Sequence, residues 1–373
     1  MQTLIKWPGG KTKEFDQIRG IIPPFDRYIE PFFGGGAVFF QLHPKEAIIN
    51  DICKELMDFY RFIKGEYDRE TFKKELYDYV NNWEKIPIYL SLFENMIEAL
   101  YEKYKSNKIE LTQLKKIIND TLIKEEKHFN GLFHKNFCLD EINLLNQIIS
   151  NLISKLKRTK DIESVRGKLP EGDLYKNIET AFRSGFYMHF RDIMNYDNTK
   201  YQISNAKRIA NYYFIREFCY GSMFRFNNNG EFNIPYGGIA YNSKDFRSKV
   251  DKVFSPETRD LLVHTTISND DFEDIFNNNR YSKKDFIFLD PPYDTDFSDY
   301  ENNCFNKNDQ KRLASCLNEI KAKFILIIKN TPFISDLYNN KVKLNISKFD
   351  KTYLYNVKGR NDREVEHLVI SNY

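Results

Sequence analysis

The segment Asp290-Pro291-Pro292-Tyr293 combines a carboxylate, two prolines and an aromatic ring, and it directly follows the apolar run 286–289. Two consecutive prolines hold the backbone in an extended geometry and remove two N–H donors, so that carbonyl oxygens are left for a ligand. Hydrogen-bond acceptors beside a stacking ring suit the exocyclic amine of a nucleobase. The alternative is a rigid turn after a strand.

A glycine-rich segment, Glu30 to Gly36, lies between a predicted strand at 28–30 and a predicted helix that begins at Ala37. Glycines allow a ligand to approach the backbone closely at the carboxyl end of a strand. Asp51 follows the next predicted strand, about twenty residues on, where an acidic side chain can bind ribose hydroxyls. This spacing predicts a nucleotide site, and a tight turn with a helix cap is the alternative.

A second glycine segment, 6–12, contains the letters GKT. A phosphate-binding P-loop needs a glycine five positions before Gly10, where this chain has Ile5, and it needs a buried strand before the loop. We therefore do not expect an ATPase of this type.

The elements that must position these motifs lie at the two ends of the chain, with a long helical block between them. Continuous apolar runs are typical of parallel strands, and apolar residues at helical spacing predict amphipathic helices. The predicted strands are 28–30, 47–49, 286–289, 324–328 and 367–370, and the predicted helices include 37–42, 56–63, 144–156, 175–195 and 212–220.

This pattern predicts an α/β fold, a doubly wound Rossmann-like sheet interrupted by an inserted, mainly helical domain. The sheet domain is expected at 1–63 and 258–373, and the insert at 64–257. Turn-forming residues predict a β-hairpin at 221–240 within the insert.

Composition and charge narrow the class of protein. The chain has 373 residues, 41% of them hydrophobic, and a formal net charge of +3, which excludes a strongly basic tail-type binder and an acidic disordered protein. It has no apolar run of about 18 residues, so we expect no membrane span. The five cysteines form no CxxC pair and are expected to be reduced thiols in a cytoplasmic protein. His128, His134 and Cys138 are expected to be surface or packed residues, because nothing completes a metal site.

Taken together, the motifs resemble those of the α-group DNA N6-adenine methyltransferases, the DNA adenine methyltransferase (Dam, D12-class) family. The cofactor motif comes first, the target-recognition region lies in the middle and the catalytic motif is late. The matching segments are 6–11, 30–39, 50–51, 224–237, 271–272, 290–293 and 364–373.

The resemblance implies a site-specific enzyme that transfers a methyl group from S-adenosylmethionine to N6 of a flipped-out adenine in double-stranded DNA. It makes the inserted domain the target-recognition domain. The catalytic residues would be Asp290, Pro291, Pro292 and Tyr293. The cofactor-binding residues would be Trp7, Lys11, Glu30, Phe32, Phe33, Gly34, Gly35, Gly36, Asp51, Asp271, Phe272 and Asp290.

The resemblance also implies DNA contacts. Arg225 is a candidate for a bidentate guanine contact, with a phosphate contact as the alternative. Tyr220 could insert where the base leaves the stack, or it could be a core ring. The full set comprises Lys6, Tyr220, Arg225, Asn227, Pro235, Lys358 and Arg360, with Arg363 in the same basic loop as the last two. The chain has Tyr220-Gly221-Ser222 where the family usually has Tyr-Asn-Gly, so no particular tetranucleotide is predicted.

Three other functions are alternatives to this one. Methyl transfer to cytosine N4 or to an RNA base would use the same fold and cofactor, but the aspartate at the head of the proline motif favours adenine by resemblance. A non-catalytic DNA-binding module would have no use for Asp51 and Asp290, and no nuclease-like cluster is present. We expect a prokaryotic or phage protein, and a cognate restriction endonuclease that acts separately is a possible partner.

Overall fold

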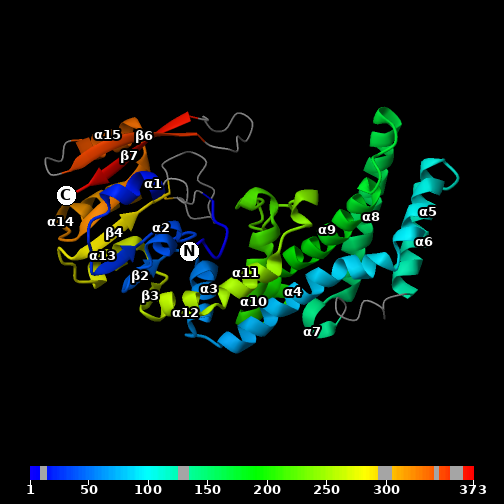
Figure 1. Ribbon diagram of the computed structural model, residues 1–373, viewed down its shortest axis with the longest axis horizontal. Helices are drawn as coiled ribbons and strands as arrows, with labels where there is room; N and C mark the ends of the chain where they lie inside the picture. The colour runs from blue at the N-terminus through cyan, green and yellow to red at the C-terminus, as the bar shows by residue number, and fades with distance from the viewer. Residues whose placement is uncertain (9–14, 125–133, 293–304, 340–343, 353–363) are drawn as a thin grey trace. The chain divides into compact units, whose positions relative to one another are not determined.

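The computed structural model describes residues 1–8, 15–124, 134–292, 305–339, 344–352 and 364–373. It divides into two compact units (Figure 1). Unit 1 comprises Met1–Tyr67, Phe224–Phe226 and Val253–Tyr373, and unit 2 comprises Asp68–Met223 and Asn227–Lys252.

Unit 1 is built on a seven-stranded sheet with the strand order β3-β2-β1-β4-β5-β7-β6. The first five strands in this order pair in parallel, and β7 is antiparallel to both of its neighbours. The strands are β1 (Arg27–Glu30), β2 (Ala47–Asn50), β3 (Thr265–Ser268), β4 (Asp285–Leu289), β5 (Lys323–Lys329), β6 (Asn345–Thr352) and β7 (Glu364–Ser371). All five predicted strands are confirmed, and so is the α/β class with a mostly parallel sheet.

The centre of the sheet is buried because its strands are almost wholly apolar. Every residue of β2 and β4 is buried, as expected for parallel strands that are covered on both faces. Ile287 and Leu326 share one apolar cluster with Ile275, Leu313 and Ile334, which belong to three different helices. The helices of unit 1 are α1 (Phe15–Ile18), η1 (Arg19–Ile21), α2 (Ala37–Leu42), α3 (Lys54–Lys64), α12 (Pro256–Val263), α13 (Phe272–Asn278), α14 (Lys307–Glu319) and α15 (Pro332–Asn339).

Unit 2 is mainly helical. Its α-helices are α4 (Arg69–Ser91), α5 (Glu94–Lys105), α6 (Leu111–Lys124), α7 (Lys135–Cys138), α8 (Glu141–Arg166), α9 (Asp173–Asn195), α10 (Asn205–Phe218) and α11 (Phe246–Val253), whose last residue is assigned to unit 1. The short helical turns are η3 (Asp197–Tyr201), η4 (Tyr220–Ser222) and η5 (Ile239–Tyr241). The helices predicted at 144–156 and 175–195 lie within α8 and α9, whereas the helix predicted to reach residue 220 ends at Phe218.

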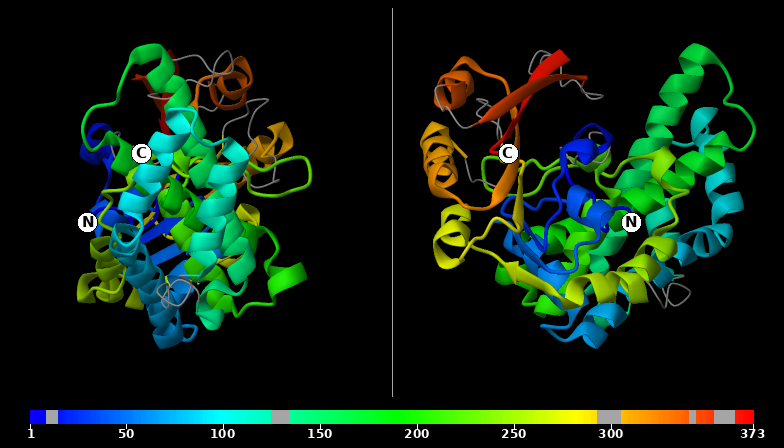
Figure 2. Two further views of the ribbon diagram at one scale, coloured as in Figure 1. Left: turned by 90° about the vertical axis from the view of Figure 1, so that its right-hand side faces the viewer. Right: turned by 60° about the vertical axis from the view of Figure 1, so that its left-hand side comes forward.

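Two features hold unit 2 together. Helices α8 and α9 lie side by side (Figure 2), and Gly185 permits this, because a Cβ there would lie 2.5 Å from the Cα of Ile148. An aromatic cluster fills the space between α4, α9 and α10. In it Tyr79 stacks on Phe214 at 5.0 Å and meets Phe190 at 4.8 Å.

The hairpin predicted at 221–240 is only partly formed. The turn is present, since the Gly230 amide donates to the Asn227 carbonyl at 3.0 Å. The described residues of this segment form no regular strand, because α9 takes up some of their backbone groups. The Asn195 side chain bonds both the N–H and the carbonyl of Phe232, and the Tyr187 hydroxyl donates to the Ile234 carbonyl.

None of the described helices is both long and apolar enough to cross a membrane.

Candidate active site

The candidate site lies where the strand order of unit 1 reverses. From β1, the chain adds β2 and β3 on one side of the sheet and β4 and β5 on the other. Ligands of open α/β sheets bind outside the carboxyl ends of the strands at such a point. The predicted cofactor and catalytic segments at 30–36, 51, 271–272 and 290–292 follow the ends of β1, β2, β3 and β4.

The glycine loop after β1 is shaped by two aromatic side chains. Gly34 and Gly36 have φ values of 50° and 67°, which glycine adopts without strain. A Cβ on Gly34 would lie 2.8 Å from the indole of Trp7, and a Cβ on Gly36 would lie 2.4 Å from the ring of Phe33. The loop therefore leaves no room for larger residues at these two positions.

Asp51 ties this loop to the end of β2. Its two carboxylate oxygens accept hydrogen bonds from the Gly34 amide at 2.8 Å and the Cys53 amide at 3.0 Å. Burial raises the pKa of Asp51, and the two amide bonds oppose that rise. Because an ionised carboxylate offers about four lone-pair sites, it can accept hydroxyl donors from a ligand as well.

Asn50, which was not among the predicted site residues, joins the ends of β1 and β3. Its buried amide nitrogen donates to the carbonyls of Pro31 and Asp270, both at 3.0 Å, and its oxygen accepts from the Asp270 amide at 2.9 Å. Asn269 adds bonds to the carbonyls of Asp51 and Ile52. The signal in the sequence was a polar residue at the end of an apolar strand.

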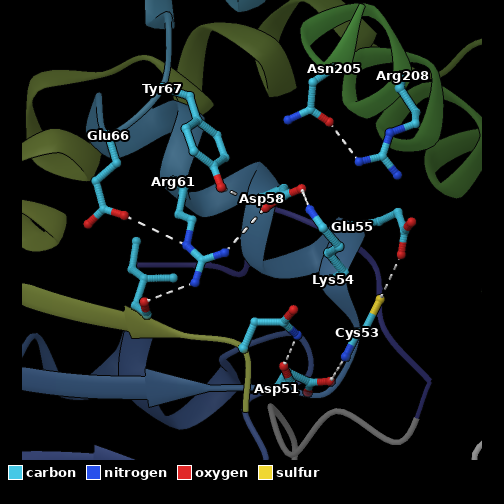
Figure 3. A network of polar contacts seen from close by, with 12 residues as sticks. Asp51, Cys53, Lys54, Glu55, Asp58, Arg61, Glu66, Tyr67, Asn205 and Arg208 are labelled. Atoms are coloured by element: carbon cyan, nitrogen blue, oxygen red, sulfur yellow. Dashed lines mark hydrogen bonds and ion pairs between the residues drawn. The ribbon is translucent and has the colours of Figure 1, made fainter. Parts of the chain in front are cut away.

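Helix α3, which begins after Asp51, is anchored by the buried carboxylate of Asp58 (Figure 3). Asp58 pairs with Lys54, with Arg61 at 3.3 Å and with the Tyr67 hydroxyl at 3.3 Å. Arg61 also donates to the Ile267 carbonyl of β3 at 3.4 Å. The network fixes the helix that begins three residues after Asp51.

An aromatic wall stands beside the ends of β1 and β3. The rings of Phe32, Phe272 and Phe305 lie 5.4 to 5.6 Å from one another. The Arg312 guanidinium lies over Phe272 at 4.8 Å and bonds the Asp271 carboxylate at 2.6 Å. Its contacts with Asp271, Glu273 and Asp309 raise the pKa of Arg312, so it stays charged.

The carboxylates of the site influence one another. Glu30 is buried and accepts a hydrogen bond from the Tyr28 hydroxyl at 2.9 Å. Its pKa is raised well above the ordinary value, chiefly by burial and further by the negative charges of Asp290 and Asp51. The structure therefore brings together three acidic residues from the ends of three adjacent strands.

The catalytic segment follows β4 directly. Pro291 is buried, whereas Asp290 and Pro292 are half-buried. The Pro292 carbonyl accepts a hydrogen bond from the Gln310 side chain at 3.1 Å. Tyr293 and Lys11, which were also predicted to belong to the site, lie outside the described residues.

The predicted DNA-binding residues are divided between the units. In unit 1, Arg225 is exposed and Lys6 is half-buried, and the ring of Phe224 lies 4.9 Å from that of Trp7. In unit 2, Tyr220 is 50% exposed, so the alternative that it is a core ring is wrong. Lys358, Arg360 and Arg363 lie outside the described residues.

Asn227 and Pro235, which belong to unit 2, have roles within the 221–240 segment. The Asn227 side chain donates to Glu231 at 2.7 Å and accepts from the amides of Asn229 and Glu231. The exposed Pro235 accepts a bond from the Tyr220 amide at 2.9 Å. Both residues therefore shape the turn region. The Asn227 side-chain amide could contact a base only in addition to its bonds with Asn229 and Glu231.

No cluster of three His, Cys, Asp or Glu side chains suited to a metal ion occurs in the described part of the chain. His134 is exposed and Cys138 is buried. The Cys138 carbonyl lies 2.7 Å from Nε2 of the buried His189, and burial lowers the pKa of this histidine to about 4.

Comparison with known proteins assigns the chain to a family. The family model for D12 class N6 adenine-specific DNA methyltransferases matches residues 7–137 and 139–354. The chain is 25% identical over 397 residues to the type II methyltransferase M.MjaIII of Methanocaldococcus jannaschii, covering 100% of this chain and 99% of that protein.

Two further relatives are named type II methyltransferases. M1.LlaDCHI of Lactococcus lactis subsp. cremoris is 21% identical over 384 residues, with 100% of this chain and 96% of that protein covered. M.CviBI of Paramecium bursaria Chlorella virus NC1A is 31% identical over 210 residues, which are 54% of this chain and 76% of that protein. Because the family model spans nearly the whole sequence, the chain belongs to the D12 class of N6 adenine-specific DNA methyltransferases.

Proposed function

We propose that unit 1 binds S-adenosylmethionine at the carboxyl ends of β1, β2 and β3 and transfers its methyl group to N6 of an adenine flipped out of duplex DNA. The observation that carries this proposal is the convergence of three groups at one edge of the sheet. They are the glycine loop bonded to Asp51, the Asp271–Phe272 wall, and the Asp290–Pro292 segment.

The residues present fit the cofactor. When bound, S-adenosylmethionine supplies an electrophilic methyl group on a sulfonium sulfur. The close-packed glycine loop offers backbone to the methionine portion, and Asp51 retains the lone pairs needed to accept ribose hydroxyls. Asp271 and Phe272 would flank the adenine of the cofactor, and Trp7 and Lys11 would complete the pocket.

The target amine is a poor nucleophile, because its lone pair is delocalised into the adenine ring. Flipping the base out of the stack costs a few kcal/mol. We propose that the Asp290 carboxylate and the Pro291 carbonyl each accept one N6 hydrogen while Tyr293 stacks on the ring. These bonds favour a pyramidal nitrogen whose lone pair is free for attack. Rate acceleration would come from positioning and fixed electrostatics.

We also propose that residues 64–257 form the target-recognition domain, with the 221–240 segment presented to DNA. Arg225 would contact guanine and Tyr220 would insert where the base leaves the stack. Lys6, Asn227 and Pro235 would approach the target bases, and Lys358 and Arg360 would contact phosphates. A restriction endonuclease that recognises the same site and acts separately is the proposed partner, since the relatives above are named type II methyltransferases.

The experiment is long-read kinetic sequencing of DNA from a methylase-deficient bacterial host that expresses the chain. An N6-methyladenine signature at one short motif is the expected result. A cytosine N4 signature would overturn the proposed acceptor, and the absence of any signature from an expressed, folded chain would overturn the proposed activity.

Asp290→Ala tests the catalytic assignment. Loss of the N6 acceptor is expected to lower kcat by at least about a hundredfold, while the Kd for S-adenosylmethionine, measured by calorimetry, stays within about threefold. Asp336→Ala on α15, at an exposed position, is the matched control. Turnover by Asp290→Ala equal to that of the wild type would contradict the mechanism.

A further inference from the structure

One helix of unit 1, α14, supports all three segments of the proposed site. Phe305, close before the helix, packs edge-on against Phe32 of the glycine-loop segment at 5.5 Å. Arg312 bonds Asp271 beyond the end of β3. Gln310 bonds the Pro292 carbonyl beyond the end of β4. Of these three contacts, the one from Gln310 reaches the catalytic segment.

Gln310 is a polar residue at a buried position of α14. Its side chain is fully buried, with 0% exposure, and among the described residues its Nε2 donates one hydrogen bond, to the Pro292 oxygen at 3.1 Å. Its own oxygen has no hydrogen-bond partner among the described residues. Burying a primary amide is unfavourable unless it is bonded, and a leucine of similar size would avoid that cost. The bond to Pro292 is therefore what this residue supplies.

The two prolines limit how the catalytic segment can be held. Pro291 and Pro292 have no N–H, so the segment cannot be held by backbone donors at these positions. At these two positions only the carbonyls can be bonded, and Gln310 bonds the one that lies two residues beyond Asp290. A shift of this carbonyl would move the Asp290 carboxylate and the Pro291 carbonyl together.

We infer that Gln310 is a positioning residue for methyl transfer, which holds the Asp290–Pro292 segment in its reactive geometry through the Pro292 carbonyl. The inference rests on the proposed function. Gln310 itself touches neither the methyl donor nor the base, so its loss affects the reacting geometry more than binding.

Gln310→Leu removes the donor at similar volume. The kcat is expected to fall about 10- to 100-fold, the range that misplacement of a reacting group by about 1 Å produces. The KM for DNA and the calorimetric Kd for S-adenosylmethionine are expected to stay within about threefold of the wild type. Thermal unfolding of the free protein is measured in parallel, so that loss of folded enzyme is separated from loss of turnover.

Gln310→Glu makes the pH dependence of kcat a test of the positioning role, because a merely structural role would not change this dependence. A protonated carboxyl donates to the Pro292 carbonyl, whereas an ionised one repels it. Burial raises the pKa of a carboxyl, so the glutamate is expected to titrate within the assay range. The ratio of variant to wild-type kcat should therefore rise as the pH is lowered. Asn318→Asp, the same chemical change at an exposed position of α14, should leave the ratio independent of pH.

A kcat of Gln310→Leu equal to that of the wild type would overturn the inference and leave the proposed function standing. The inference would also be overturned if both Gln310 variants lost activity by the same factor at every pH and in proportion to loss of folded protein. If the wild-type chain transferred no methyl group to DNA, the proposed function would fail first and the inference with it.

Discussion

At the scale of single residues, the carboxylates of the candidate site differ in how readily they give up a proton. Asp51 is bonded by two backbone amides, which oppose the effect of burial on its pKa. Burial and the charges of Asp290 and Asp51 raise the pKa of Glu30 much further, although its carboxylate accepts a hydrogen bond from the Tyr28 hydroxyl. The two acids should therefore respond differently to pH.

Glu30→Gln tests this difference. An unfolded glutamate has a pKa of about 4.3, and the raised pKa in the folded state means that the folded protein keeps the proton to higher pH. The stability that protonated Glu30 contributes is fully present below the ordinary pKa and is lost as the pH rises to the folded-state pKa. The free energy of unfolding of the variant, relative to the wild type, should therefore increase between pH 5 and pH 8.

Urea denaturation at both pH values measures the effect. Glu319→Gln, at an exposed position of α14, is the control and should show no such dependence. A difference between Glu30→Gln and the wild type that is the same at pH 5 and pH 8 would contradict the raised pKa.

At the scale of elements, α13 and α14 are joined through one guanidinium. Arg312 of α14 bonds Asp271, which caps the first turn of α13 by accepting from the Glu273 amide at 2.9 Å. It also bonds Glu273 at 2.7 Å and lies over Phe272. A planar guanidinium can make these contacts at once, whereas a lysine ammonium cannot.

Arg312→Lys is therefore expected to loosen the Asp271–Phe272 wall without moving the catalytic segment. The KM for S-adenosylmethionine should rise about threefold to tenfold, with kcat nearly unchanged. This is the pattern expected when a contact that stabilises the ground state and the transition state equally is lost. Steady-state kinetics on a DNA substrate measures both constants, and Lys311→Arg at the exposed neighbouring position is the control. A fall in kcat at constant KM would show that Arg312 acts on the reacting groups instead.

The elements also show what could be predicted from the sequence. The strands β1, β2, β4, β5 and β7 contain apolar runs, and their burial in the sheet follows directly. The two edge strands were missed. Only Ile267 is a large apolar residue in β3, and β6 interleaves Ile346 and Phe349 with polar residues, because an edge strand is less completely buried.

The candidate site divides in the same way. The loop and strand-end residues, such as Asp51 and Asp290, stand in motifs with a characteristic spacing. Asn50, Gln310 and Arg312 act through contacts with other segments, and such contacts are set by tertiary packing. Asn50 at least stands at the end of an apolar strand, whereas no local pattern in a single sequence marks Gln310 or Arg312.

At the scale of the whole molecule, unit 2 has a hydrophobic core of its own. All of unit 2 lies within residues 68–252, a span of about 185 residues of which only 224–226 belong to unit 1. Domains of this size commonly fold alone. The aromatic cluster around Tyr79, Trp83 and Phe214 lies entirely within the span.

A fragment comprising residues 68–252 is therefore expected to fold by itself. It should show a helical circular dichroism spectrum, a cooperative thermal transition and no methyl transfer, because it lacks Asp51 and Asp290. The fluorescence of Trp83, its only tryptophan, should change at the same temperature as the helical signal. Non-coincident or gradual transitions would show that the core of unit 2 depends on unit 1.

The strand order of unit 1 has a consequence for the order of events during synthesis. β1 pairs with β4, and β2 pairs with β3, yet the whole of unit 2 is translated between the members of each pair. β1 and β2 can pair with each other early, but each lacks its second partner during the time in which a helical unit rich in local contacts can already form. Contacts this distant in sequence form slowly, so Tyr28, Ile29 and Ile48 are the apolar surface that the nascent chain has to shield longest.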